Sequence, residues 1–166
     1  MACIVVMGVA GCGKSVLGAA LAQALAWPMI EGDAFHPAEN VAKMRAGTPL
    51  DDADRSGWLT ALGVELQRYP DGAILACSAL KRAYRDKLRT AVPDLRFVHL
   101  EVTPEEARRR VASRAGEHYF QSHLVSSQFE ALENPQDEPG VLCVDATRPV
   151  ASLTRQVVQW NRENPR

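Results

Sequence analysis

Eight residues near the start of the sequence combine glycines, a lysine and a hydroxyl group in a spacing typical of phosphate binding. Residues 8–15 read Gly-Val-Ala-Gly-Cys-Gly-Lys-Ser. Because glycines have no Cβ, consecutive main-chain N–H groups can curl around an anion there. Lys14 can reach the β and γ phosphates of a nucleoside triphosphate, and the Ser15 hydroxyl can ligate Mg²⁺. The residues that we expect to contact the nucleotide are Gly8, Val9, Ala10, Gly11, Cys12, Gly13, Lys14, Ser15 and Val16.

The segments on either side of this loop give it the expected setting. Residues 2–7 are apolar and rich in β-branched side chains, as in a buried parallel strand, and residues 16–25 carry apolar side chains at helical spacing before Pro28. The order strand, loop, helix is the context in which such a loop binds phosphate. A chance glycine-rich turn that only caps a helix is the alternative, and the strand, Lys14 and Ser15 in register weigh against it.

Two polar side chains, Asp33 and His36, follow the next short apolar segment, which begins at Pro28. In an open parallel sheet, ligands lie beyond the carboxyl ends of the strands, so both side chains would share an edge with the phosphate loop. Asp33 could orient or deprotonate a hydroxyl group, and His36 could hydrogen-bond a polar substrate. A helix-capping Asp33 and a surface His36 explain the same spacing equally well.

A dense basic segment follows the strand predicted within 72–80. It begins after Ser78 and includes Lys81 and Arg85. A basic helix face is usually just solvated, but this one starts at the edge of a central strand, so we favour an anion-facing role for Lys81 and Arg85.

A later helix, predicted from the cap Thr103 onward, carries several arginines. Arg110 and Arg114 are four residues apart and share a helix face, an arrangement suited to clamping phosphate oxygens, whereas a run of solvated arginines is the alternative. The segment that follows contains glycine, polar and aromatic residues, so we expect a mobile helical lid at about 114–131.

These side chains need an α/β scaffold to bring them together. Apolar strands are predicted within 2–7, 28–32, 72–80, 96–102 and 141–145, and they alternate with helical segments, the last of them 150–160. This alternation indicates a three-layer α/β domain with a five-stranded parallel sheet. A helix is also expected from Pro37 to before Gly47, and Asp54 is a candidate cap for the next one.

Length and composition favour one ordinary globular domain spanning residues 1–166. The hydrophobic fraction is 46%, charged residues make up 23%, and the formal net charge is −1. This charge gives no global basic field to attract nucleic acid or anionic lipid. No stretch approaches the ~20 apolar residues of a membrane span, and the start does not resemble a signal peptide, so we expect a cytoplasmic location.

The four cysteines are Cys3, Cys12, Cys77 and Cys143, and they lack the paired short spacing of a zinc site. We therefore expect reduced thiols in a core. Cys12 is a special case, because nearby N–H groups and Lys14 would favour its thiolate and make it sensitive to alkylation.

Beyond the loop, several segments together resemble gluconate kinases, a branch of the P-loop small-molecule kinases, over nearly the whole chain. The loop departs from that pattern at Cys12, where a small hydroxyl residue is common, and the lid departs at Gly116-Glu117-His118, where Gly is expected directly before His. The matching segments are 31–37, 40–44, 47–50, Asp54-Arg55 with Trp58-Leu59, 77–81, 84–86 and 127–130.

The resemblance implies transfer of the γ-phosphoryl group of ATP to the 6-hydroxyl of D-gluconate, by a homodimer in the cytoplasm. It also implies the sheet order 2-3-1-4-5, with Lys14, Asp33, Arg110 and Arg114 as the catalytic residues and the two arginines in the lid hinge. The substrate-binding residues expected on this basis are Asp33, His36, Lys43, Arg55, Ser78, Lys81, Arg85, His118 and Gln128. For the substrate carboxylate, Lys81, Arg85 and His36 are the candidates.

Two other functions fit the loop. One is a kinase of another small hydroxy acid, such as shikimate, or of a nucleotide. The other is a nucleotide-binding switch without a small-molecule acceptor, which would leave the polar groups at the strand ends without a role.

Overall fold

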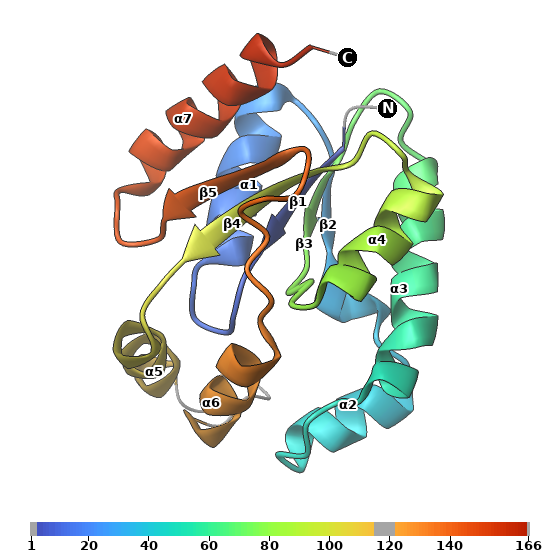
Figure 1. The fold of residues 1–166 in the computed structure, drawn as a ribbon, viewed down its shortest axis with the longest axis vertical. Helices are drawn as coiled ribbons and strands as arrows, with labels where there is room; N and C mark the ends of the chain where they lie inside the picture. The colour runs from blue at the N-terminus through green and yellow to red at the C-terminus, as the bar shows by residue number, and fades with distance from the viewer. Residues whose placement is uncertain (1–2, 115–121, 166) are drawn as a thin grey trace.

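The computed structural model describes residues 3–114 and 122–165 and contains a five-stranded sheet in which all neighbouring strands are parallel (Figure 1). The strand order is β2-β3-β1-β4-β5, which confirms the predicted order. The central strands β1 and β3 are buried along their whole length, because helices cover both faces of the sheet. The strands are β1 Ile4–Met7, β2 Met29–Glu31, β3 Ile74–Ala76, β4 Arg96–Glu101 and β5 Val141–Asp145.

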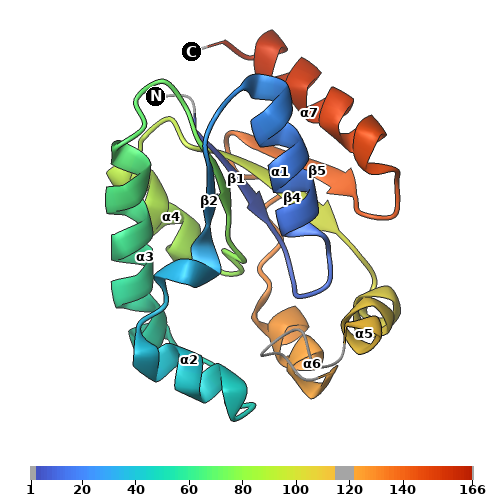
Figure 2. The same cartoon turned by 180° about the vertical axis from the view of Figure 1, so that it is seen from behind.

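Two pairs of helices cover the two faces, as Figures 1 and 2 show from opposite sides. Helices α1 (Lys14–Leu25) and α7 (Val150–Glu163) pack on one face, and α3 (Asp52–Gln67) and α4 (Arg82–Ala91) on the other. Each face has its own apolar core, and the three predicted layers are confirmed. Within the described ranges, no helix combines the length and apolar character needed to cross a membrane.

The remaining helices gather at the carboxyl ends of the strands. In Figure 1, α2 lies below one side of the sheet and α5 and α6 lie below the other. The predicted lid segment includes helix α6, while residues 115–121 lie outside the described ranges. These elements are the 3₁₀ helix η1 Gly32–Phe35, α2 Ala38–Arg45, α5 Pro104–Ser113 and α6 Ser122–Ala131.

Local sequence explains where these helices begin. Thr103 caps α5 and Pro104 follows it, as predicted. The cap of α3 is Asp51, one turn earlier than the predicted Asp54: the Asp51 side chain accepts from the Asp54 N–H, and the Asp54 side chain accepts from the Asp51 N–H. Asp54 therefore completes a capping box as its third residue and is not the cap itself.

Candidate active site

The loop between β1 and α1 has the backbone of a phosphate cradle. Gly8, Gly11 and Gly13 have φ values of 146°, 80° and 98°, which side chains rarely adopt. A Cβ on Gly8 would lie 2.7 Å from the Cys12 Sγ, so the loop closes on itself there. Because α1 begins at Lys14, directly after Gly13, the positive end of its dipole faces the loop.

Oxygen ligands suited to Mg²⁺ lie beside this loop. The Ser15 Oγ donates a 2.8 Å hydrogen bond to Oε1 of Glu31, at the end of β2. Both residues line a pocket that also holds Gly11, Gly13 and Lys14. A hydroxyl and a carboxylate form the hard donor set that Mg²⁺ prefers, so the residues present fit this ion. The sequence analysis missed Glu31, although its position next to Gly32-Asp33 at a strand end was a usable signal.

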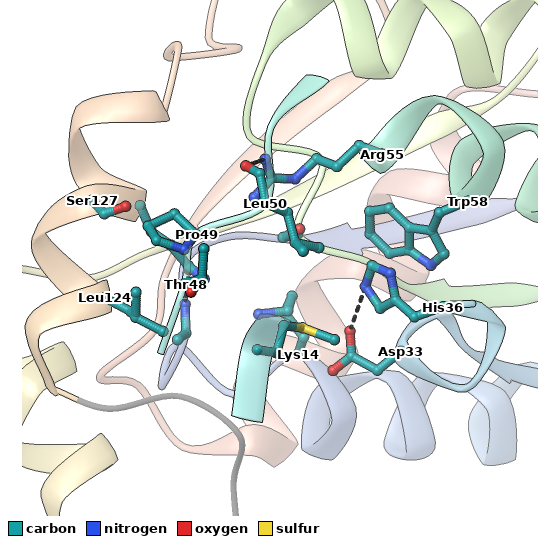
Figure 3. A pocket seen from close by; sticks show the side chains of 14 residues that line it. Lys14, Asp33, His36, Thr48, Pro49, Leu50, Arg55, Trp58, Leu124 and Ser127 are labelled. Carbon is teal, nitrogen blue, oxygen red and sulfur yellow. Dashed lines mark hydrogen bonds and ion pairs between the residues drawn. The ribbon is translucent and has the colours of Figure 1, made fainter. Parts of the chain in front are cut away.

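A second, open pocket adjoins the first (Figure 3). One wall carries Asp33, His36 and Trp58, and the wall opposite carries Leu124 and Ser127 from α6. We call this pocket the acceptor cleft. Its lining residues are Ala10, Lys14, Asp33, His36, Met44, Thr48, Pro49, Leu50, Arg55, Trp58, Ser78, Leu124, Ser127 and Gln128.

The two pockets meet at shared residues. Ala10, Lys14 and Asp33 line both the pocket beside the loop and the acceptor cleft. The Lys14 Nζ donates to the carbonyl oxygens of Gly8 and Val9, both at 3.1 Å, which holds the ammonium group at the loop. A cation and a carboxylate therefore border the junction between a phosphate site and a second ligand site.

His36 is held by two neighbours, Trp58 and Asn40. Its ring stacks on Trp58, with centroids 4.1 Å apart and planes at 17°, and the Trp58 Nε1 donates to the Gly32 carbonyl at 2.8 Å. The Asn40 Nδ2 donates to the Asp54 carbonyl at 2.9 Å, which fixes the amide orientation, and lies 3.2 Å from the His36 Nδ1. A group that only donates requires Nδ1 to accept, so the ring proton lies on Nε2.

This ring nitrogen lies on the Asp33 side, because the His36 Nε2 is 3.8 Å from the Asp33 Oδ1. The side chain of His36 is 3% exposed and that of Asp33 is 60% exposed. Burial lowers the pKa of His36, against the opposing effect of the Asp33 carboxylate. The structure thus places a neutral donor beside an accessible carboxylate, and the prediction that the two share an edge with the loop is confirmed.

Besides Lys14, Arg55 is the predicted cationic residue that lines the acceptor cleft. Its guanidinium donates to the Leu50 carbonyl and lies over the Tyr84 ring, 5.5 Å from the centroid. Lys43 and Lys81 lie outside the cleft lining and pair with other carboxylates, Lys43 with Asp54 at 2.8 Å and Lys81 with Asp52 at 3.0 Å. Both lysines tie neighbouring helices together in the structure.

The anion-facing role predicted for Arg85 is wrong. Its side chain is 0% exposed, and its Nε and Nη2 donate to the Glu138 carboxylate at 2.7 and 3.1 Å. The guanidinium also donates to the carbonyls of Ala79, Leu80 and Glu133. Arg85 therefore joins the segment after β3 to the segment before β5. The amphipathic pattern of α4 put Arg85 on the buried side, and only the carboxylate 53 residues later explains why a charge is tolerated there.

Arg110 and Arg114 lie next to the phosphate loop, but their contacts differ from a simple clamp. Arg110 pairs with Glu106 at 2.9 Å and donates to the carbonyls of Gly11 and Cys12, both at 3.3 Å, and of Ala146 at 3.1 Å. It thus braces the loop against α5. Arg114 lines the pocket beside the loop and the adjacent groove that contains Thr147, Arg148 and Pro149. The sequence analysis did not single out this groove.

Three predicted site residues remain: Gln128, Ser78 and His118. Gln128 is buried in α6, and its Oε1 accepts from the Ala10 N–H at 2.6 Å, so it joins the predicted lid to the loop. Ser78 lines the cleft. His118 lies outside the described residues.

The alkylation-sensitive thiolate predicted for Cys12 is wrong. The residue is 1% exposed, and burial raises its thiol pKa despite the opposing charge of Lys14. The side chain belongs to the apolar core, with its sulfur against Gly8.

Comparison with known proteins agrees with this geometry. A family model described as an AAA domain matches residues 3–139. The thermosensitive gluconokinase of Escherichia coli is 40% identical over 93% of this chain and 84% of its own length. The gluconokinase of Gluconobacter oxydans is 42% identical over 87% of this chain and 83% of its own.

A solved gluconokinase structure is also similar to this chain. The crystal structure of a gluconokinase from Sinorhizobium meliloti superposes with a TM-score of 0.88 at 44% identity, covering 96% of this chain and 91% of that one. Identity at this level over nearly full length is more than a shared fold. The chain belongs to the gluconokinase family of P-loop kinases.

Proposed function

We propose that this chain transfers the γ-phosphoryl group of MgATP to the 6-hydroxyl of D-gluconate, giving 6-phospho-D-gluconate and ADP. The observation that carries the proposal is the junction of the two pockets at Lys14 and Asp33. Phosphoryl transfer needs a phosphate site and a hydroxyl acceptor in line, and membership of the gluconokinase family supports gluconate as that acceptor.

On the nucleotide side, the loop amides and Lys14 would hold the β and γ phosphates. Ser15 and Glu31 would hold Mg²⁺, which supplies charge neutralisation on the phosphate oxygens when bound. The groove lined by Arg110, Arg114 and the residues after β5 adjoins Gly13, so we assign it to the nucleoside. Because Arg110 is occupied with loop carbonyls, its part is to keep the cradle in shape, and Arg114 is the arginine that reaches phosphate.

On the acceptor side, Asp33 orients the 6-hydroxyl and accepts its proton as the bond to phosphorus forms. His36 donates from Nε2 to a substrate hydroxyl. Arg55 pairs with the gluconate carboxylate, a role for which Arg85 is too buried and Lys81 lies outside the cleft lining. The transition state is loose, so positioning and charge neutralisation account for most of the rate.

ADP release with MgATP, measured over D-gluconate, shikimate, nucleoside monophosphates and no acceptor, tests this assignment. We expect turnover on gluconate to exceed the others by at least about 10²-fold, since unpaired polar groups penalise a wrong acceptor. Preference for shikimate or a nucleotide would favour the kinase alternatives. Tight nucleotide binding without any acceptor-dependent turnover would favour a switch.

Two variants separate the roles within the cleft. Asp33→Asn is expected to reduce kcat about 10²-fold or more with an unchanged fold. Arg55→Met is expected to raise the KM for gluconate about 10–100-fold with a smaller change in kcat, because it removes a charged hydrogen bond to bound substrate. Arg68→Met is the matched control, since Arg68 is the exposed C-cap of the same helix and pairs only with Glu65 among the described residues.

We also propose that the enzyme has a moving lid and forms a homodimer. A lid over residues 114–131 would close over the γ-phosphate and exclude water, and Gln128 would couple that movement to the loop through Ala10. We place the enzyme in the cytoplasm as a homodimer. Light scattering at micromolar concentration tests the dimer, and a Gln128→Ala variant with a higher ratio of ATP hydrolysis to transfer would support the lid assignment.

A further inference from the structure

Three potential metal ligands of different chemistry meet on β4 and β5, outside the site described above. They are His99, Glu101 and Cys143, and one ligand atom of each lies within 4.8 Å of the other two. His99 is paired with Cys143 in the sheet register, and Glu101 is two residues from His99, so the three side chains share one face of the sheet. Sequence spacing alone hides this cluster, because Cys143 is 44 residues from His99.

The cluster borders a groove of its own. His99 and Glu101 line it together with Asn134 and Gln136, and Val9 is the phosphate-loop residue that borders it. Among the described residues, those that line this groove do not line either pocket of the candidate active site. The groove therefore gives access to the cluster without passing through the acceptor cleft.

The cluster offers a nitrogen, a sulfur and a carboxylate oxygen, the donor types that zinc-like ions bind. His99 is 4% exposed, and burial lowers its pKa, so the ring is neutral and can offer a nitrogen lone pair at neutral pH. Burial and the Glu101 carboxylate raise the pKa of Cys143 to about 11. A carboxylate next to a thiol disfavours a second negative charge, and a divalent cation would reverse that effect by binding both groups. The thiol proton would then leave to solvent.

The simpler reading is a thiol–imidazole hydrogen bond, since the Cys143 Sγ lies 3.8 Å from the His99 Nδ1. In that reading the Cys143 thiol also hydrogen-bonds the Glu101 carboxylate, so metal titration decides between a hydrogen-bonded cluster and a metal site. Metal–ligand bonds of ~2.0–2.3 Å place the ligand atoms of a tetrahedral site about 3.5 Å apart. The sulfur and nitrogen are already near that distance, and the exposed Glu101 can close the remainder by rotating its side chain.

We propose that His99, Glu101 and Cys143 form a binding site for Zn²⁺, with a fourth position open to water from the groove. Nitrogen, sulfur and carboxylate ligands together select zinc-like ions and not Mg²⁺, which prefers oxygen ligands alone. The ion would fasten β5, the edge strand, to β4. This site is independent of the proposed kinase activity.

Titration of the untagged full chain with Co²⁺, in buffer containing excess Mg²⁺, tests the site. Co²⁺ reports a bound thiolate through a charge-transfer absorption band, and Zn²⁺ should abolish that band by displacement. We expect one Co²⁺ per chain, no band in Cys143→Val, and at least about tenfold weaker binding in Glu101→Gln. The control Cys3→Ala should bind as the parent does, because Cys3 is buried beneath Tyr69 and away from the cluster.

Thermal unfolding provides the second measurement. Zn²⁺ should raise the Tm of the parent chain and of Cys3→Ala but not that of Cys143→Val, because only a ligand that binds the folded state shifts its stability. A band that survives in Cys143→Val, equal affinity in Glu101→Gln, or no saturable binding below millimolar Co²⁺ would overturn the proposal. A parent-like circular dichroism spectrum and a cooperative unfolding transition in each variant show that it has folded, so a failure here is separable from a failure of the kinase assignment.

Discussion

The two sides of the active site are built in different ways. The phosphate side consists of one continuous stretch from Gly8 to Ser15, in which main-chain groups and glycine conformations make the cradle. The acceptor side is assembled from η1, the loop after α2, α3 and α6, and its chemistry is carried by side chains such as Asp33, His36 and Arg55.

This difference separates general from specific recognition. A triphosphate presents the same oxygens to every P-loop enzyme, so a local backbone motif suffices to bind it. An acceptor must be told apart from similar molecules, which requires polar side chains fixed at several points. Changes on the phosphate side should therefore affect every acceptor equally, whereas changes on the acceptor side should affect gluconate selectively.

The largest effect is expected for Lys14→Met, which removes the one charged side chain that the phosphate loop itself supplies. Because Lys14 borders both pockets, its loss should lower kcat about 10³-fold for gluconate and for any weaker acceptor alike. Steady-state ADP release measures it. Lys87→Met is the control, since Lys87 lies on α4 and donates to Ser56, away from the cleft. A loss confined to one acceptor would contradict the division of roles.

Arg85→Met should act on stability and leave chemistry intact. Removing this guanidinium leaves the Glu138 carboxylate buried without its closest partner, although Arg89 at 3.3 Å and Arg82 at 3.7 Å remain beside it. Breaking a buried pair typically costs about 3–5 kcal/mol of unfolding free energy. Urea denaturation should show this loss, while kcat per folded molecule stays unchanged. A fall in gluconate affinity with an unchanged free energy of unfolding would mean that Arg85 does contribute to binding the acceptor.

The same contrast explains how far the sequence could be interpreted. The phosphate side and the sheet order were predictable, because strand, loop and helix are contiguous and each strand is a short apolar run between helices. Glycine spacing determines the cradle locally. The predicted cap of α3, Asp54, lies one turn after the observed cap, Asp51. The two residues cap the helix jointly, and single-residue preference does not distinguish them.

The acceptor side was predictable only in part. Asp33 and His36 follow a strand end, so their place followed from topology, but Arg85 and Arg55 could not be told apart by residue type. Arg85 is buried against Glu138, while Arg55 faces the cleft. The contacts that decide this are long-range pairings between segments that have no sequence signal of their own. The His99–Cys143 cluster was missed for the same reason.

Asn40→Asp should test how the acceptor side holds His36, because Asn40 contacts His36 but does not line the cleft. Asn40 donates to the His36 Nδ1, whereas a carboxylate there would accept from it, move the neutral ring proton to Nδ1 and raise the His36 pKa. We expect the KM for gluconate to rise about fivefold while the KM for ATP is unchanged, since one neutral hydrogen bond is typically worth about 1 kcal/mol.

The pH profile distinguishes positioning from simple destabilisation. Burial lowers the pKa of His36 below 6.5 in the parent chain, and Nε2 carries a proton in both the neutral ring and the imidazolium, so kcat/KM for gluconate should change little as His36 titrates. In Asn40→Asp the neutral ring carries its proton on Nδ1, so kcat/KM should be lowest at high pH and recover as the pH falls through the raised pKa and Nε2 gains a proton. Asn134→Asp is the matched control, because its side-chain oxygen accepts from the Gln136 N–H and a carboxylate can keep that bond. An identical profile in all three proteins would remove the positioning role of Asn40.

The smallest effect on activity is expected for Cys12, a residue of the phosphate loop whose side chain is buried in the core. Cys12→Ser should change kcat and both KM values by less than about twofold, and unfolding free energy by about 1 kcal/mol at most. The reason is that the loop binds through its main chain, while the Cys12 sulfur is buried beneath Gly8 with a raised pKa. Alkylation followed by peptide mass spectrometry gives an independent measure: in the native protein, Cys12 should label slowly with or without ATP, because the folded core protects it and the nucleotide does not. Rapid labelling that ATP suppresses would mean that the thiol faces the phosphate site, and the phosphate side would then depend on side chains as the acceptor side does.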